Sequence, residues 1–246
     1  MNERKRLFKR MFIAVIYVAI FIGLGTGIYF LVRPTPVPPP PPPPIVDPID
    51  TIWSQVFVSG QDLYSIGAKI RNPNTGFGAS YFTYTFYLYD ASGNLLSSKP
   101  GESFIWPGES KYLIEAGIEL LKAPVSVKLQ LGEPTWREVK DFKSIDLTVG
   151  NIFYGKGKAG SGKFYEVNAT ASNGTSYDIS KVYVSAVLFG RGNLPIAVNS
   201  TIFENLKSKE RRPFSMPWFS PFSGIPTSVD LSISTNLFDR PELLGQ

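Results

Sequence analysis

Hydrophobic and polar residues follow two different patterns along this chain, and the first is an unbroken apolar run. From Met11 to Val32 no side chain is charged. A helix rises about 1.5 Å per residue, so this segment would be about 33 Å long, enough to cross a hydrocarbon core of about 30 Å. We predict a transmembrane helix over residues 11–32.

The second pattern begins near Ile52 and has a period of two. Between Tyr81 and Asp90 the residues Phe82, Tyr84, Phe86 and Leu88 fall on one face of an extended chain. Residues 125–131 and 182–188 alternate in the same way, and such alternation predicts strands with one buried face. Turn-forming sequences separate the runs at residues 72–76, 90–94 and 190–193. We expect at most a turn or two of helix in this part, at residues 115–121.

The strand-rich part contains an internal repeat with a spacing of about 100 residues. Residues 64–72 match 165–173, residues 88–95 match 187–194, Phe104 falls opposite Phe203, and residues 127–131 match 229–233. Because the order of these features is kept, we interpret them as two copies of one domain, joined near residues 141–150. The size of each copy and its short strands are typical of an immunoglobulin-type sandwich.

One short motif in the first copy resembles a known family. Residues 86–90 read Phe-Tyr-Leu-Tyr-Asp, which is similar to the F-x-L-Y-D signature of the FxLYD domain, an immunoglobulin-like β-sandwich. Arg71-Asn-Pro-Asn74 and Trp106-Pro-Gly-Glu109 add to the resemblance, whereas the second copy lacks the signature. The resemblance implies an extracytoplasmic module of anchored bacterial envelope proteins without known catalysis. It also implies structural roles for Phe86, Leu88, Tyr89 and Asp90.

The flanks of the apolar run predict its orientation. Residues 1–10 contain five basic residues and one acidic residue, while the other flank has only Arg33 nearby. Positive charge stays on the cytoplasmic side, so we expect the N-terminus inside and residues 33–246 outside. A cleaved signal peptide is the alternative, but its apolar core is usually 7–15 residues long. We therefore favour an uncleaved signal anchor in the cytoplasmic (inner) membrane.

The net charge excludes one class of function. The chain carries +5, with 25 basic and 20 acidic residues. Six of the basic residues and one acidic residue lie before residue 34, which leaves 19 of each sign beyond it. The basic character is a topology signal, not a footprint for nucleic acid. Pro38 to Pro44 form an unbroken run within residues 33–50, which we interpret as a stiff extended spacer.

Few residues suggest catalysis or cofactor binding. The chain has no Cys and no His, so disulfides, thiolate chemistry and Cys/His zinc sites are excluded. Four carboxylates crowd one stretch of the first copy, at Glu102, Glu109, Glu115 and Glu119, but their spacing does not indicate a glycosidase pair. The glycine-rich residues 155–162 lack the spacing of a phosphate loop, so we expect a hairpin tip. We predict no enzyme activity and no cofactor.

Three further features suggest contacts or modification. An aromatic segment at residues 213–222 is expected to lie in an edge strand or loop, because Pro217 and Pro221 cannot donate to a central ladder. It offers either a partner-contact patch or rings that close the second sandwich, and the candidate residues are Phe214, Met216, Trp218, Phe219 and Phe222.

Gly23 and Gly27 fit a helix-packing motif that would permit homodimerisation. Glycosylation sequons occur at Asn168, Asn173 and Asn199, and they matter only in a eukaryotic secretory context.

Together these patterns predict an all-β protein of two tandem immunoglobulin-like β-sandwiches behind a single N-terminal transmembrane helix and a proline-rich linker. The expected parts are a basic tail (1–10), the helix (11–32), the linker (33–50) and the two sandwiches (51–145 and 146–246). We expect a non-enzymatic, membrane-anchored envelope protein that contacts the bilayer through residues 11–32 and binds another envelope protein or a wall component. The alternatives are an energy-transducing or secretion- or pilus-assembly scaffold component, and a carboxylate-based extracytoplasmic hydrolase.

Overall fold

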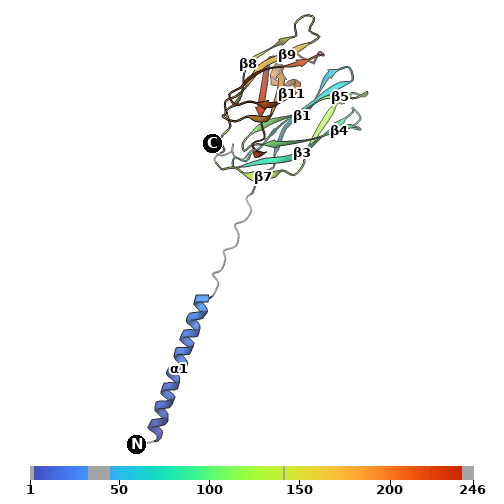
Figure 1. The fold of residues 1–246 in the computed structure, drawn as a ribbon. Coiled ribbons are helices and arrows are strands. Elements are labelled where there is room, and N and C mark those ends of the chain that lie inside the picture. Colours follow the sequence, from blue (N-terminus) through green and yellow to red (C-terminus); the bar gives the residue numbers. More distant parts are fainter. Residues whose placement is uncertain (1–2, 33–44, 141, 240–246) are drawn as a thin grey trace. The chain divides into compact units, whose positions relative to one another are not determined.

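The chain forms one N-terminal helix followed by a body made of antiparallel strands. A computed structural model describes residues 3–32, 45–140 and 142–239. Residues 1–45 and residues 46–246 are two separate compact units. The predicted fold class, all-β sandwiches behind a single apolar helix, is confirmed (Figure 1).

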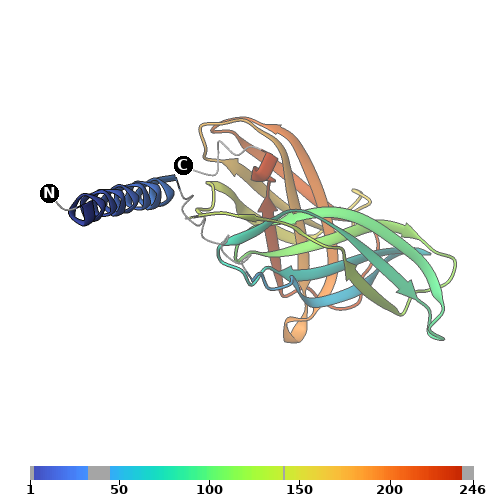
Figure 2. The same cartoon turned by 90° about the horizontal axis from the view of Figure 1, so that it is seen from below.

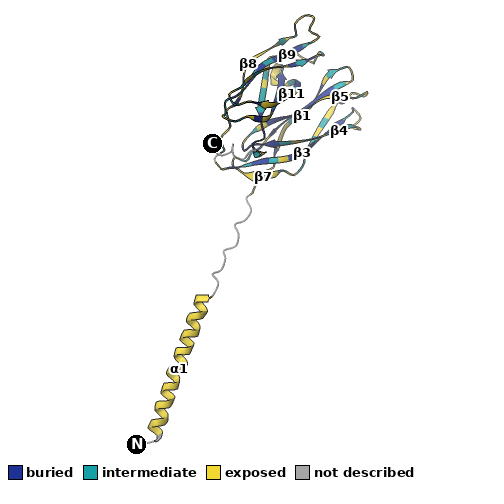
Figure 3. Ribbon diagram, in the orientation of Figure 1, coloured by how far each residue is buried: buried dark blue, intermediate teal, exposed yellow. Residues whose placement is uncertain are grey.

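Helix α1 (Glu3–Val32) is long and apolar enough to cross a membrane. Its side chains are exposed from Arg4 to Val32, as the uniform colour of the helix in Figure 3 shows. The helix begins at Glu3, so the basic residues of the predicted tail already lie within its first turns. Most of the proline-rich spacer, residues 33–44, lies outside the described residues.

The first seven strands build two sheets that face each other. They are β1 (Asp50–Gly60), β2 (Leu63–Arg71), β3 (Phe77–Tyr89), β4 (Leu95–Ile105), β5 (Ser110–Glu119), β6 (Ser126–Leu131) and β7 (Thr135–Glu138). One sheet has the order β1-β2-β5, and the other has the order β4-β3-β6 with β7 also paired to β3. The chain joins this sandwich before β1, because Asp47 and Asn74 exchange two hydrogen bonds of 2.9 and 2.8 Å and Ile49 is buried.

The remaining strands repeat this topology. They are β8 (Leu147–Lys156), β9 (Tyr165–Asn173), β10 (Ile179–Phe189), β11 (Pro195–Leu206), β12 (Arg211–Trp218) and β13 (Ser228–Ser234), with short 3-10 turns η1 (Arg191–Asn193) and η2 (Leu237–Asp239). The sheets β12-β9-β8 and β11-β10-β13 correspond strand by strand to β5-β2-β1 and β4-β3-β6. Figures 1 and 2 show the two groups of strands, blue to green and yellow to red, as neighbouring sandwiches.

Alternation in the sequence decides which side chains fill each sandwich. Phe82, Tyr84, Phe86 and Leu88 of β3 are all buried against Ile66, Ala68 and Ile70 of β2. In the second sandwich Val182, Val184, Ala186 and Leu188 of β10 pack with residues of β9 and β12. Each sheet therefore has one face in a core, as period-two sequences require.

The expected alignment of the two copies is correct for β2 with β9 and for β6 with β13. It is one residue out for β3 with β10 and for β4 with β11. The register between β3 and β6 makes Val127 equivalent to Val229, as expected. Leu188, however, is the core equivalent of Leu88, whereas Val187 points to the opposite face. A slip of one residue exchanges the two faces of a strand, and the same slip separates Phe104 from Phe203.

Two local expectations also have outcomes. Residues 115–119 belong to strand β5, so the helical turn expected at residues 115–121 is wrong, because pairing with β2 extends the backbone there. Residues 157–164 connect the antiparallel pair β8 and β9, with the Gly157 N–H donating to Phe164 O at 3.1 Å. The glycine-rich segment is therefore a hairpin connection, as expected.

Candidate functional site

The two sandwiches meet through the outer faces of two sheets. Phe57 and Tyr112 of the first sandwich are buried against Val187 and Val198 of the second. Gly67 of β2 permits the close approach, since a Cβ there would lie 3.1 Å from a methyl carbon of Val198. Tyr112 also donates a 2.6 Å hydrogen bond from its hydroxyl to the Asp230 carboxylate, and burial together with this acceptor raises the pKa of Tyr112.

A second contact surrounds Trp106, which follows β4. Its indole is stacked between the rings of Phe142 and Phe238, with centroid distances of 5.1 and 4.2 Å. Its Nε1–H donates to the carbonyl oxygen of Thr235 at 3.3 Å. Because Trp106 lies in the first sandwich and Thr235 follows the last strand of the second, these contacts join the sandwiches into one packed body.

A cavity of about 480 Å³ opens at this junction, and both sandwiches line it. The first sandwich contributes Tyr84, residues 101–104 of β4 and residues 111–116 of β5, and the second contributes residues 183–185 of β10 and 200–202 of β11. Successive side chains of a strand point to opposite faces. A cavity that touches six consecutive residues of β5 therefore runs along the free edge of that strand. Its volume falls in the range of ligand sites.

Lys111 places a buried positive charge at one end of the cavity. The residue is 6% exposed, and its Nζ donates to the carbonyl oxygen of Phe104 at 3.0 Å and lies 3.2 Å from the centroid of that ring. Burial lowers the pKa of Lys111 to about 8, and nearby Glu109 opposes that shift. Among the described residues, no carboxylate oxygen lies within 4.0 Å of this ammonium.

A carboxylate lines the cavity farther along β5. Glu115 accepts a 2.8 Å hydrogen bond from the Tyr84 hydroxyl, and burial together with this carboxylate raises the pKa of Tyr84. Glu102 of β4 also touches the cavity, but it pairs with Thr83 and its exposed side chain lies on the outer face of the sheet, opposite to Tyr84. Because Lys111, Leu113 and Glu115 alternate on one face of β5, the strand carries opposite charges on either side of a core leucine. The cavity is therefore bipolar.

The second sandwich also has a basic residue at the position of Lys111, so the contacts of the two side chains can be compared. Arg212 is its equivalent, because Ile70 pairs with Lys111 as Ala171 pairs with Arg212. Arg212 also donates to a carbonyl of the neighbouring edge strand, that of Glu204, at 2.9 Å. Unlike Lys111, it forms an ion pair with a carboxylate, that of Glu210, at 2.8 Å. The Lys111 ammonium therefore makes the same bond to a carbonyl, but the carboxylate equivalent to that of Glu210, Glu109, acts on it only from beyond 4.0 Å.

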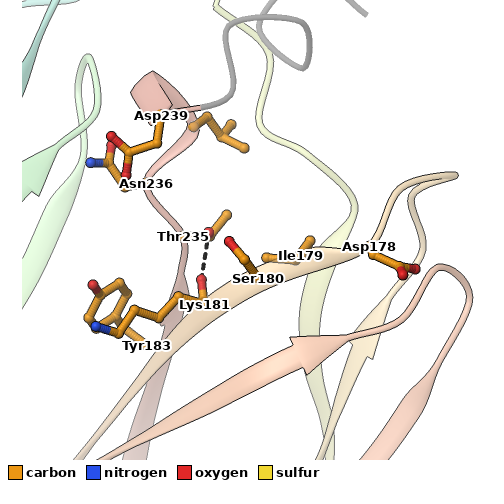
Figure 4. Close-up of a pocket in the computed structure, with 9 residues that line it drawn as sticks. Asp178, Ile179, Ser180, Lys181, Tyr183, Thr235, Asn236 and Asp239 are labelled. Atoms are coloured by element: carbon orange, nitrogen blue, oxygen red, sulfur yellow. Dashed lines mark hydrogen bonds between the residues drawn. The ribbon is translucent and has the colours of Figure 1, made fainter.

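A smaller cavity, of about 60 Å³, lies where β10 begins and η2 follows β13. Figure 4 shows its lining, including Asp178, Lys181 and Asp239, and the 2.7 Å hydrogen bond from the Thr235 hydroxyl to Lys181 O. This volume holds only a few water molecules. The junction cavity is the larger candidate site.

The four signature residues lie in and after β3. Phe86 and Leu88 are fully buried, and Tyr89 is half-buried. Asp90 accepts hydrogen bonds from the backbone N–H groups of Ser92 and Asn94, at 2.8 and 2.9 Å. The side chains Phe86 and Leu88 therefore fill the core and Asp90 fixes the turn, which are the structural roles expected for them.

The aromatic segment divides between core and surface. Met216 and Trp218 lie in edge strand β12 and are buried, and the Trp218 indole N–H donates to Val198 O at 3.2 Å. Phe214 and Phe222 are half-buried against the same core. Phe219, at 68% exposed, is the one residue of the five that faces solvent. The segment closes the second sandwich, and a contact patch made of all five residues is wrong because the core takes their apolar surface.

The remaining candidates are not among the residues that line the cavity. Gly23 and Gly27 are exposed on α1. Asn173 is 1% exposed and its amide nitrogen donates to three backbone carbonyls, so this sequon is not accessible in the folded chain. Asn168 and Asn199 are half-buried.

Sequence reasoning named Glu102 and Glu115 only within a scattered acidic stretch, and it missed Lys111. One signal was present: Lys111 and Glu115 occupy the same phase of an alternating strand as Leu113, where a core-facing apolar residue is expected. No family model matches the chain, and no relative is found among the curated proteins.

Proposed function

We propose that this chain is a non-enzymatic, single-pass membrane protein of the cell envelope. It holds two packed β-sandwiches, the first an FxLYD-like domain, outside the cytoplasm for contact with another protein or a wall component. The observation that carries the proposal is an exposed apolar helix with five basic residues at its N-terminal end, in a chain whose remaining part forms two β-sandwiches. The basic end favours retention of the N-terminus on the cytoplasmic side of the inner membrane.

The packed junction supports a presenting role for the body. Phe57, Tyr112, Val187 and Val198 bury apolar surface between the sandwiches, and Trp106 is enclosed by rings from two other segments. Tandem domains with such apolar contacts hold a fixed relative orientation, whereas small polar interfaces permit domain motion. A partner would therefore meet one composite surface.

Single cysteines test the topology cleanly, because the chain has none of its own. We expect a membrane-impermeant maleimide to label Ser126→Cys, an exposed position of β6, in intact cells or spheroplasts. Lys9→Cys should react only after lysis. Labelling in the opposite order, or a mature chain whose N-terminus lies beyond residue 27, would overturn the proposal.

A further inference from the structure

Three strand edges meet at the junction cavity. Within the part of the chain that the structure describes, β4 pairs only with β3, β5 only with β2, and β11 only with β10. All three contribute consecutive residues to the lining. A strand edge presents a row of N–H and C=O groups that an added strand can pair with.

The register of β5 identifies which backbone groups face the cavity. The Asn72 N–H donates to Glu109 O at 2.9 Å, so these two residues are a hydrogen-bonded pair. Such pairs alternate along an antiparallel ladder. With Ile70 opposite Lys111 and Ala68 opposite Leu113, the backbone groups of Tyr112 and Ile114 point away from β2. They are directed towards the free edge and the cavity.

The charges in the cavity add a direction to this edge. The Lys111 ammonium has three donors, and one of them is used by Phe104 O. Glu115 lies four residues farther along β5, about 13 Å in an extended strand. A ligand that matches both ends carries a carboxylate and, three or four residues away, a cation.

We infer that the junction cavity binds the free C-terminal end of a partner polypeptide in extended conformation. The partner's terminal carboxylate lies at Lys111, its backbone pairs with β5, and a basic side chain upstream lies near Glu115. The bound strand runs antiparallel to β5, because its end is at the start of that strand. This inference deepens the proposed function and rests on it for the partner being a protein.

The test uses the purified full chain in lipid nanodiscs and two immobilised tetrapeptide libraries. The libraries have the same sequences, one with free C-terminal carboxylates and the other with C-terminal amides. We expect retention on the carboxylate library with Lys and Arg enriched at an upstream position, and about tenfold or greater loss on the amide library. Lys111→Met should show the same loss on the carboxylate library. Lys128→Met, at an exposed position of β6, should bind as the unmodified chain does.

The Glu115 carboxylate has a separate readout. The variant Glu115→Gln should lose the enrichment of Lys and Arg while keeping the preference for a free carboxylate. Equal retention on both libraries, or none on either at about 1 mM peptide, would overturn the inference, as would full retention by a folded Lys111→Met. The comparison of libraries needs no variant, so it holds even where a substitution prevents folding. Because the protein is purified, a failed topology test leaves this result unaffected.

Discussion

The two sandwiches have the same topology but place their large core side chains on opposite layers. In the first, Phe82 and Phe86 of β3 fill the core, and the equivalent residues of β10 are Val182 and Ala186. In the second, the volume comes instead from Trp218 and its neighbours on β12, where β5 has smaller or polar residues. A close-packed core requires a certain total side-chain volume, but that volume can come from either sheet. The two copies therefore fill the same fold with large side chains from different strands.

The copies also differ in polarity at one place. Glu115 and Tyr84 form a hydrogen-bonded pair in the first sandwich, where the second has the apolar residues Met216 and Val184. The junction cavity opens at this polar pair. Where the copies differ only in the size of core side chains, both cores are filled. Where they differ in polarity, the first sandwich has the candidate site.

The largest expected effect tests where the core volume lies. Phe86→Ala should lower the free energy of unfolding by about 3–5 kcal/mol, because it removes a fully buried ring from the layer that supplies the first core. Urea unfolding of the full chain in detergent, followed by tryptophan fluorescence, measures this. Phe219→Ala is the matched control, since that ring is mostly exposed, and it should change stability by about 0.5 kcal/mol or less. Equal effects of the two substitutions would refute the assignment of core faces.

A second comparison concerns two equivalent buried amides. The Asn72 side chain donates to the carbonyls of Phe77 and Trp106 at 2.7 and 2.8 Å, and Asn173 donates to three carbonyls in the other copy. Replacing either residue with Ala leaves buried carbonyls without donors and should cost about 1–3 kcal/mol. Asn168→Ala, on the outer face of β9, serves as the control in the same unfolding assay. If Asn72→Ala left the free energy of unfolding unchanged while Asn173→Ala lowered it, the two copies would not share stabilisation by a buried amide.

Much of the fold was predictable because alternation is a local property. The strands through Phe86 and Val184, their buried faces and the apolar helix follow directly from spacing of apolar residues. The alignment of β3 with β10 was one residue out, although both strands pair with their partners in the same way and have the same register shift, after Leu88 and after Leu188. The letters Gly-Asn-Leu occur in both turns, at residues 93–95 and 192–194, but the hydrogen bonds of the turns make Asn94 equivalent to Leu194. Similar letters in a turn therefore do not fix the register of the strands beside it.

The candidate site was not predictable in the same way. Its lining combines residues 101–116 with residues 183–202, and these segments meet only because the outer faces of two sheets pack together. That packing depends on details such as the absence of a side chain at Gly67. The sequence carried the charges of Lys111 and Glu115, but no local pattern showed which surface would cover them.

The smallest expected effect separates the two turns that follow the central strands. Asp90 caps the first turn, and Gly190 stands at the same position in the second. The Lys122 ammonium and the hydrogen bonds from Asn94 and Ser92 hold the pKa of Asp90 well below its usual range. A carboxyl whose folded-state pKa is lowered adds stability above its unfolded pKa of about 3.9, and that stability is lost as the pH falls through the folded pKa.

Asp90→Asn should therefore lower the melting temperature at pH 7, and the difference in melting temperature from the unmodified chain should narrow as the pH falls below about 4. Asp62→Asn, in the turn between β1 and β2, is the matched control for replacing a turn carboxyl with an amide. A gap for Asp90→Asn that stays constant from pH 7 to pH 3 would mean that the carboxylate charge contributes nothing at this turn, and that the two turns differ only in backbone geometry.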